Sequence, residues 1–241
     1  DDSNSDAQVV SATDTNAYPG TRLLRTVAVI KTDNFEKPFL LDIFKVASKS
    51  RNQYDLPFYF LGQVISANFE SQTPSELRPL GKTYGYQHLY LEGKGTATAG
   101  NTKFSWLGNG RFRTLTTVTE ASDELMFTRI GANDPAFNLR RDAGFMIRRN
   151  NAASTVFAST VELHGSYSPV SENAINSHSN IAKLTIVYDD EDHTAVSIED
   201  IDGTLHIFAL SNRDASASSV HRIKIRGQFY EWTGPYLFSS R

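Results

Sequence analysis

Cysteine is absent from all 241 residues of this sequence, so neither a disulfide framework nor a thiolate metal site can form. No apolar run approaches the roughly 20 residues that a membrane-spanning helix needs, and the polar first 20 residues show no signal peptide. A strong charge of one sign is also missing, because 24 Lys and Arg stand against 27 Asp and Glu. We therefore expect neither a nucleic-acid partner nor a membrane partner.

Recognisable catalytic and metal-binding motifs are missing as well. The sequence contains no nucleophile elbow, no phosphate-binding glycine loop and no dinucleotide fingerprint. Its six histidines show none of the short spacings of a zinc site, and they are His88, His164, His178, His193, His206 and His221. We expect no catalytic residue and no metal site within this chain.

Short runs rich in Val, Ile, Thr, Tyr and Phe recur along the chain, and no segment keeps a helical apolar period over three turns. Turn signals such as GNG at 108–110 and DG at 202–203 separate the runs. This pattern predicts an all-β fold, an antiparallel β-sandwich of two sheets in a single domain over residues 1–241. The predicted strands are 21–31, 38–48, 57–70, 85–98, 103–118, 124–131, 144–150, 155–165, 182–190, 194–200, 204–211 and 221–232.

The stretch 55–92 carries the most information about function. It reads DLPFYFLGQVISANFESQTPSELRPLGKTYGYQHLYLE and places His88 among Tyr84, Tyr86 and Tyr90. Aromatic faces with polar tips suit a sugar-binding surface, which makes His88 a candidate donor at the mouth of a cleft. The alternative is a pair of core strands with a half-buried, hydrogen-bonded His88.

Two loops supply the other candidate residues. The segment 127–142, FTRIGANDPAFNLRRD, holds Arg129 and Asn133, and this mixture of guanidinium and amide groups suits an anionic saccharide. A loop held together by Arg–Asp pairs is the alternative. Glu172 closes the phrase HGSYSPVSE after a predicted strand, where it could accept hydrogen bonds from sugar hydroxyls.

Several long phrases, in order, resemble one known family: DLPFYFLGQVISANFE, LGKTYGYQHLYLEGKG, FSWLGNGRFRTLTT, LMFTRIGANDPAFNLRRDAGFMIRR, FASTVELHGSYSPVSE and WTGPY. They are similar to the C-terminal β-region of oligoalginate lyases of polysaccharide lyase family 17, within the heparinase II/III-like superfamily. The resemblance runs from about Thr21 to Tyr236.

The resemblance implies a secreted or periplasmic enzyme that pairs an N-terminal α/α toroid with a C-terminal antiparallel β-sandwich. Such enzymes cleave alginate oligosaccharides from an end by β-elimination, with Tyr and His in the proton-transfer roles, and carry a structural zinc. In the family these proton-transfer residues and the zinc ligands lie upstream of the part that this sequence matches. The resemblance therefore implies no catalytic role here, and we expect the isolated chain to be inactive.

What the resemblance does carry over is a set of substrate-binding candidates, Glu172 first and then His88, Arg129 and Asn133. The implied partners are an alginate oligosaccharide and the upstream toroid, and a homodimer is a further candidate assembly. Two other interpretations stay open: a non-catalytic alginate-binding module, and a lyase for another uronate polymer of the heparan or glucuronan type.

Overall fold

The computed structural model describes residues 6–131 and 142–240. It confirms the predicted all-β, sandwich-like fold, because all the strand pairings it describes are antiparallel. The strands are β1 (Ala7–Asp14), β2 (Thr21–Ile30), β3 (Phe39–Phe60), β4 (Gln63–Ala67), β5 (Leu89–Thr96), β6 (Gly100–Gly108), β7 (Arg111–Thr119), β8 (Glu124–Ile130), β9 (Ala143–Ser168), β10 (Asn173–Ile175), β11 (Ile181–Asp189), β12 (His193–Asp200), β13 (Leu205–Ser211), β14 (Val220–Ile225), β15 (Gln228–Thr233) and β16 (Tyr236–Ser240). One 3-10 turn, η1 (Tyr86–His88), precedes β5.

The strands form three sheets. A ten-stranded sheet follows the order β1-β2-β3-β9-β7-β6-β4, with β10 and β8 also on β9 and β5 on β8. A four-stranded sheet has the order β11-β12-β13-β16, and β14 and β15 pair as a separate hairpin. The two-sheet prediction therefore describes the two main layers, to which this hairpin adds a third sheet.

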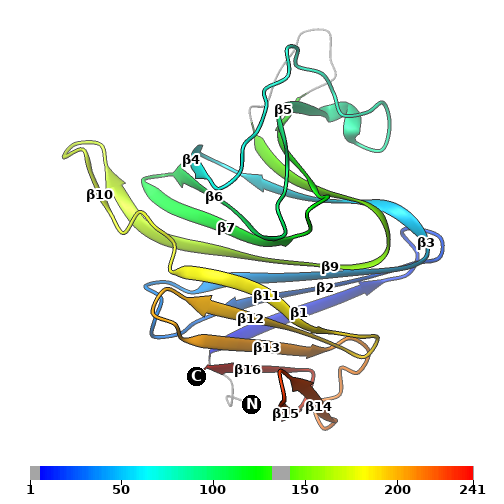
Figure 1. Cartoon of the computed structure of the whole chain (residues 1–241). Helices are drawn as coiled ribbons and strands as arrows, with labels where there is room; N and C mark the ends of the chain where they lie inside the picture. The colour runs from blue at the N-terminus through cyan, green and yellow to red at the C-terminus, as the bar shows by residue number, and fades with distance from the viewer. Residues whose placement is uncertain (1–5, 132–141, 241) are drawn as a thin grey trace.

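The lower layers in Figure 1 form the sandwich region, where the four-stranded sheet packs against one face of β1, β2, β3 and β9. Alternation along β2 buries Leu24, Ala28 and Ile30 on this face. From the opposite sheet they meet Ile198 and Phe208, both 0% exposed. Burying such apolar side chains contributes roughly 25 cal/mol per Å² of area removed from water.

Above the sandwich region, the large sheet bends and closes over itself to form the curled region (Figure 1). Its core is mostly aromatic and includes Phe60, Phe104, Trp106 and Phe145. The bend lies in β3 and β9, where the register shifts between Ala47 and Asn52. Such irregularities bend a strand and increase its twist.

Four predicted strands are joined in pairs. Segments 38–48 and 57–60 belong to β3, and segments 144–150 and 155–165 belong to β9. The polar stretches between them read as loops in the sequence, but they continue the ladder at the bend. Conversely, the predicted strand 57–70 is broken at Gly62, whose φ is +133° and whose added Cβ would lie 2.2 Å from the Leu107 carbonyl oxygen.

Other boundaries follow local turn chemistry. The predicted GNG turn is confirmed, since Asn109 and Gly110 both have positive φ and connect β6 to β7. β1 was not predicted, because its residues lie in a polar stretch, yet it pairs with β2 over its full length. Within the described residues, no helix has the length and apolar character needed to cross a membrane.

Candidate functional site

Arg129 lies near the end of β8 in the curled region, with Tyr90 of β5 and Ala143 of β9 as its strand partners. Its guanidinium group forms an ion pair with the Glu92 carboxylate, and the two side chains remain 32% and 30% exposed. The pair is therefore ordered but still in contact with solvent. A guanidinium in this state can exchange one carboxylate partner for another.

A hollow of about 310 Å³ opens beside this pair. The rings of Phe60 and Phe127 contribute to its wall, and Gly144 of β9 contributes to its rim. A Cβ on Gly144 would lie 2.5 Å from the Thr128 hydroxyl oxygen, so a larger residue here would require the Thr128 side chain to move. The combination of an apolar wall and one charged pair is typical of ligand pockets, although this hollow is at the small end of their range.

The His88 backbone is hydrogen-bonded to Gly131, two residues after Arg129, but His88 is not in the predicted strand 85–98. It ends η1, and β5 begins at the next residue, Leu89. Tyr84 and Gly85 adopt left-handed conformations, with φ of 59° and 88°, and form a turn before η1. The His88 side chain is exposed, while its carbonyl accepts a 2.8 Å hydrogen bond from the Gly131 N–H.

The other two predicted site residues are not brought into this group. Asn133 lies outside the described residues. Glu172 is exposed, has a φ of 53°, and lies in the turn between β9 and β10. Figure 1 shows β10 in an arm at the left of the molecule, whereas η1 and β5 lie at the top right. The structure thus groups His88 with Arg129 and places Glu172 on a separate arm.

Sequence reasoning missed a polar network on the outer face of the curled region. Asp55 of β3 accepts two hydrogen bonds of 2.8 Å from Arg148, one from Nε and one from Nη2. It also accepts a hydrogen bond from the Tyr86 hydroxyl, and the Arg148 guanidinium carbon lies 5.9 Å from the centre of the Tyr86 ring. The network anchors η1, and therefore the segment that leads to His88, to the sheet.

The electrostatics of this network favour a structural role. Burial and the hydrogen bond to Asp55 raise the pKa of Tyr86 to about 12. The hydrogen bond to Asp55 also raises the pKa of Arg148. At neutral pH Tyr86 therefore keeps its proton and is a poor general base, because an effective base has a pKa near the working pH.

The sequence does contain a weak signal for this network. Arg148 and Arg149 are adjacent in a strand, so their side chains point to opposite faces. Arg148 pairs with Asp55 outside, and Arg149 pairs with Asp123 inside, through hydrogen bonds of 2.9 and 2.6 Å. Two charged residues in succession within an apolar strand indicate a pairing requirement on both faces, but they do not identify the partners.

No group of three or more His, Asp or Glu side chains within residues 6–131 and 142–240 is placed to hold a metal ion. The histidines that come closest are His193 and His221, whose Nε2 and Nδ1 atoms lie 3.2 Å apart. His193 follows the acidic run 189–192, begins β12 and is half-buried. The described residues do not fit a family-type zinc site.

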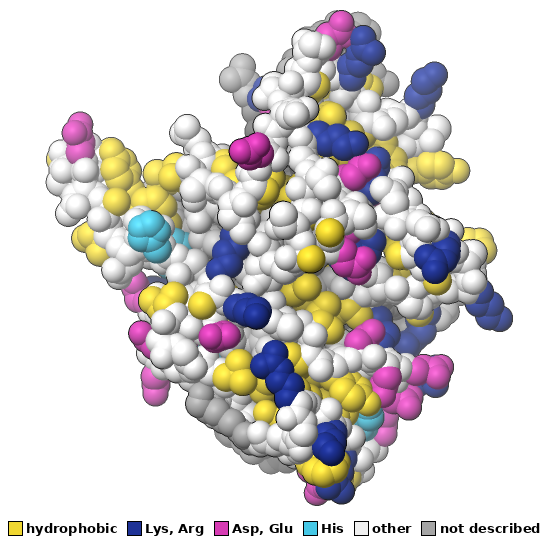
Figure 2. Space-filling view, viewed as in Figure 1, with side chains coloured by type: hydrophobic (Ala, Val, Ile, Leu, Met, Phe, Trp, Pro, Cys, Tyr) yellow, Lys and Arg dark blue, Asp and Glu magenta, His cyan; other side chains and the backbone are white. Residues whose placement is uncertain are grey.

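Charges of both signs are interspersed over the face shown in Figure 2, and no single-sign field covers it. Ion pairs such as Arg129–Glu92 and Lys94–Glu124 join residues of opposite sign on β5 and β8. The overall charge is −3.

Comparison with curated proteins supports the expected resemblance. The chain is 31% identical over 232 residues to an alginate lyase of Stenotrophomonas maltophilia, which covers 96% of this chain and 31% of that enzyme. It is 30% identical over 237 residues to an exo-oligoalginate lyase of Saccharophagus degradans, covering 96% of this chain and 32% of that enzyme. The chain is homologous to part of these lyases. It spans about a third of their length.

Two further comparisons give less. No protein-family model matches the chain. Among solved structures, the heparan sulfate lyase HepC of Pedobacter heparinus is similar with a TM-score of 0.45 and 12% identity, covering 95% of this chain and 26% of that one. A mutant of the same lyase has a TM-score of 0.41 and 14% identity over the same shares.

Proposed function

We propose that this chain is the C-terminal β-sandwich part of an exolytic oligoalginate lyase, which supports an α/α toroid and forms one wall of the substrate cleft. The observation that carries the proposal is the identity of 31% and 30% to two alginate-degrading enzymes over 96% of the chain. Because the match spans about a third of those enzymes, the activity is proposed for the complete lyase. We place that lyase in the periplasm or outside the cell.

The reaction is a β-elimination at a uronate. A base removes the C5 proton, the electron pair forms the C4–C5 double bond, the C4–O4 bond breaks, and O4 receives a proton. The uronate carboxylate must be neutralised first, because its charge opposes removal of the neighbouring proton. We assign this neutralisation to Arg129, which is held beside the hollow and can leave Glu92 for a substrate carboxylate.

The proton transfers are assigned to the toroid and not to this chain. Tyr86 lies in η1 with His88, and its raised pKa of about 12 makes it unsuited to accept a proton at neutral pH. The zinc that the family implies is also placed outside the described residues, which offer no group of three ligands. We therefore expect residues 1–241 alone to be catalytically inactive.

The test uses the complete lyase and an ultraviolet assay for unsaturated uronate. Replacing Arg129 by Gln removes a charge-assisted hydrogen bond, worth about 1.5–3 kcal/mol, so kcat/KM should fall about 10- to 100-fold. Arg78→Gln is the matched control, because Arg78 forms an exposed surface pair with Glu76. Unchanged kinetics in Arg129→Gln would remove Arg129 from the cleft, and a complete lyase inactive on oligoalginate would reject the function.

A second candidate, an alginate-binding module, is favoured by Tyr59. This ring is 55% exposed and lies against Gly144, where an added Cβ would come 3.4 Å from the ring carbons. An exposed aromatic face over a glycine is a suitable platform for a sugar ring. Calorimetry of residues 1–241 with oligoalginate separates the two functions: micromolar binding favours the module, and no binding favours a cleft wall that needs its toroid.

The choice of polymer is tested separately. A panel of alginate, heparan-type and glucuronan oligosaccharides, assayed with the complete lyase, compares the proposed substrate with the two related uronates. The highest kcat/KM on oligoalginate is expected. A higher value on either other polymer would change the substrate but keep the lyase.

A further inference from the structure

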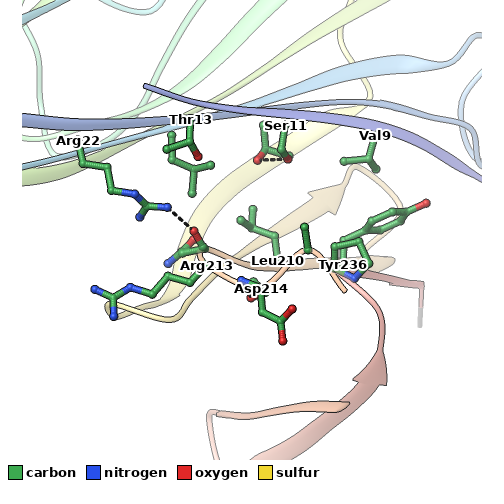
Figure 3. A pocket seen from close by; sticks show the side chains of 14 residues that line it. Val9, Ser11, Thr13, Arg22, Leu210, Arg213, Asp214 and Tyr236 are labelled. Carbon is green, nitrogen blue, oxygen red and sulfur yellow. Dashed lines mark hydrogen bonds between the residues drawn. The ribbon is translucent and has the colours of Figure 1, made fainter. Parts of the chain in front are cut away.

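A second hollow, of about 350 Å³, lies between the two main sheets at the β1 edge of the sandwich region (Figure 3). β1 and β2 form its upper wall, and the end of β13, the loop that follows and the start of β16 form its lower wall. Its volume lies within the range of ligand pockets, about 300–1,000 Å³. It shares no lining residue with the hollow beside Arg129.

The hollow exists because the sheets end at different places. β1 is an edge strand of the large sheet, and β16 is an edge strand of the smaller one. The side chains of Ser11 and Thr13 on β1 face the second sheet in Figure 3 but remain exposed. The hydroxyl groups of Ser11 and Thr13 are therefore available to a ligand, because the second sheet does not cover them.

Arg22 supplies a positive charge at one end of this hollow. Its Nη2 atom donates a 2.6 Å hydrogen bond to the Asn212 carbonyl, which fixes the side chain in a half-buried position. Within the described residues no carboxylate lies within ion-pair distance of Arg22, in contrast to its neighbour Arg25, which pairs with Asp42. A guanidinium has five N–H donors, so Arg22 keeps both donors and charge for an anion.

The remaining walls offer hydroxyl and apolar groups. The Ser11 and Thr26 hydroxyl oxygens lie 2.7 Å apart, so one of the two protons remains free to be donated outward. Asp214 accepts a 2.8 Å hydrogen bond from the Ser216 N–H, and its side chain points away from β1 in Figure 3. The Tyr236 ring forms an apolar side of the hollow (Figure 3).

We propose that this hollow binds a single uronate unit at a site separate from the cleavage cleft. Arg22 takes the carboxylate, Ser11 binds a ring hydroxyl, and the sugar C–H groups lie on Tyr236. The recognition of a hydroxylated carboxylate rests on these residues alone. Only the identity of the natural ligand, as mannuronate or guluronate from alginate, rests on the proposed function.

The experiment measures binding by saturation-transfer NMR to the complete protein carrying Arg129→Gln, which weakens the other site. The probes are mannuronate and glucuronate, with mannose and glucose as neutral counterparts. Both uronates should bind at least tenfold more tightly than the neutral sugars. Equal binding of acid and neutral sugar, or no binding of any probe, would overturn the proposal.

Adding Arg22→Gln locates the site. The uronate affinity should fall to the level of the neutral sugars, while Arg222→Gln, on the separate β14–β15 hairpin, should leave it unchanged. If Arg22→Gln does not fold, Thr13→Trp decides, because the added ring fills the hollow from exposed β1. If the uronate affinity is unchanged in Arg22→Gln or in Thr13→Trp, the proposed site in this hollow is wrong. A complete lyase that is inactive on alginate would reject the proposed function but would not contradict uronate binding in this hollow.

Discussion

The sandwich region and the curled region are packed with different side chains. Between the two sheets the core is largely aliphatic, with Ile30, Leu41 and Val196 fully buried. In the curled region Phe60, Phe104 and Trp106 lie within 5.3–5.4 Å of one another, ring centre to ring centre. The space between the two stacked sheets, which in such folds lie about 10 Å apart, is filled here mainly by aliphatic side chains, whereas the interior of the curled region is filled mainly by aromatic rings.

The regions also differ in how they use charge. The curled region has a buried Arg149–Asp123 pair inside and the Arg148–Asp55 pair outside. It also contains the hollow beside Arg129 and the turn that carries His88. The curled region thus combines an aromatic interior with a polar rim, and this rim carries the candidate residues His88 and Arg129.

The largest effect is expected for Trp106, which is 6% exposed. Trp106→Ala should lower the free energy of unfolding by about 3–5 kcal/mol, because a large cavity remains among the other rings. Ile198→Val in the sandwich region should cost only about 0.5–1.5 kcal/mol. Denaturant titration measures both, and equal losses would remove the contrast between the two cores.

The next effect concerns the buried ion pair. Asp123→Ala should cost about 3 kcal/mol, because it leaves the 3%-exposed Arg149 without its main partner. Arg149 also lies 3.2 Å from Glu120, which keeps the loss at the lower end of the usual range. Asp55→Ala should cost less, since Arg148 is more exposed. The same denaturant titration tests this order, and a larger loss from Asp55→Ala would reverse it.

A pH effect is expected at Tyr86. Its folded pKa of about 12 lies above the ordinary value of 10.0, so the folded state holds this proton more tightly. The resulting stability is fully present below pH 10 and is lost as the pH rises towards 12. The measurement is the melting temperature of the parent minus that of Tyr86→Phe, which should shrink across this window. A constant difference would contradict the anchoring of η1 by the phenol.

The smallest effect on stability is expected for Glu172. Its side chain is exposed on the β9–β10 arm, so Glu172→Gln should change the free energy of unfolding by less than about 0.5 kcal/mol. In the complete lyase we expect the same change to reduce turnover several-fold. Unchanged kinetics would remove Glu172 from the substrate-binding residues and confine the site to the curled region.

The sequence predicts those features that depend on neighbouring residues. Short β-branched and aromatic runs identified most strands, and the Asn109–Gly110 turn was located correctly. Local pattern also misled, because the aromatic run around His88 contains Tyr84 and Gly85, which form a turn before η1. Turn-forming φ values outweighed the strand preference of the surrounding residues.

Features that depend on distant residues were not predicted. Asp55 meets Tyr86 across 31 positions and Arg148 across 93, and no local pattern links them. The joining of strands into β3 and β9 has the same cause, since Asn52 pairs with Ala152. Arg129 was predicted from the residue types in segment 127–142, but its ion-pair partner Glu92 is known only from the fold.

β3 and β9, of 22 and 26 residues, each cross both packed regions and pair with one another along most of their length. Opening either core therefore disturbs a ladder that the other core also holds. We expect the two regions to exchange their slowest amide protons at one common rate. A substitution in the aromatic interior should then loosen the distant uronate hollow only by unfolding the whole chain.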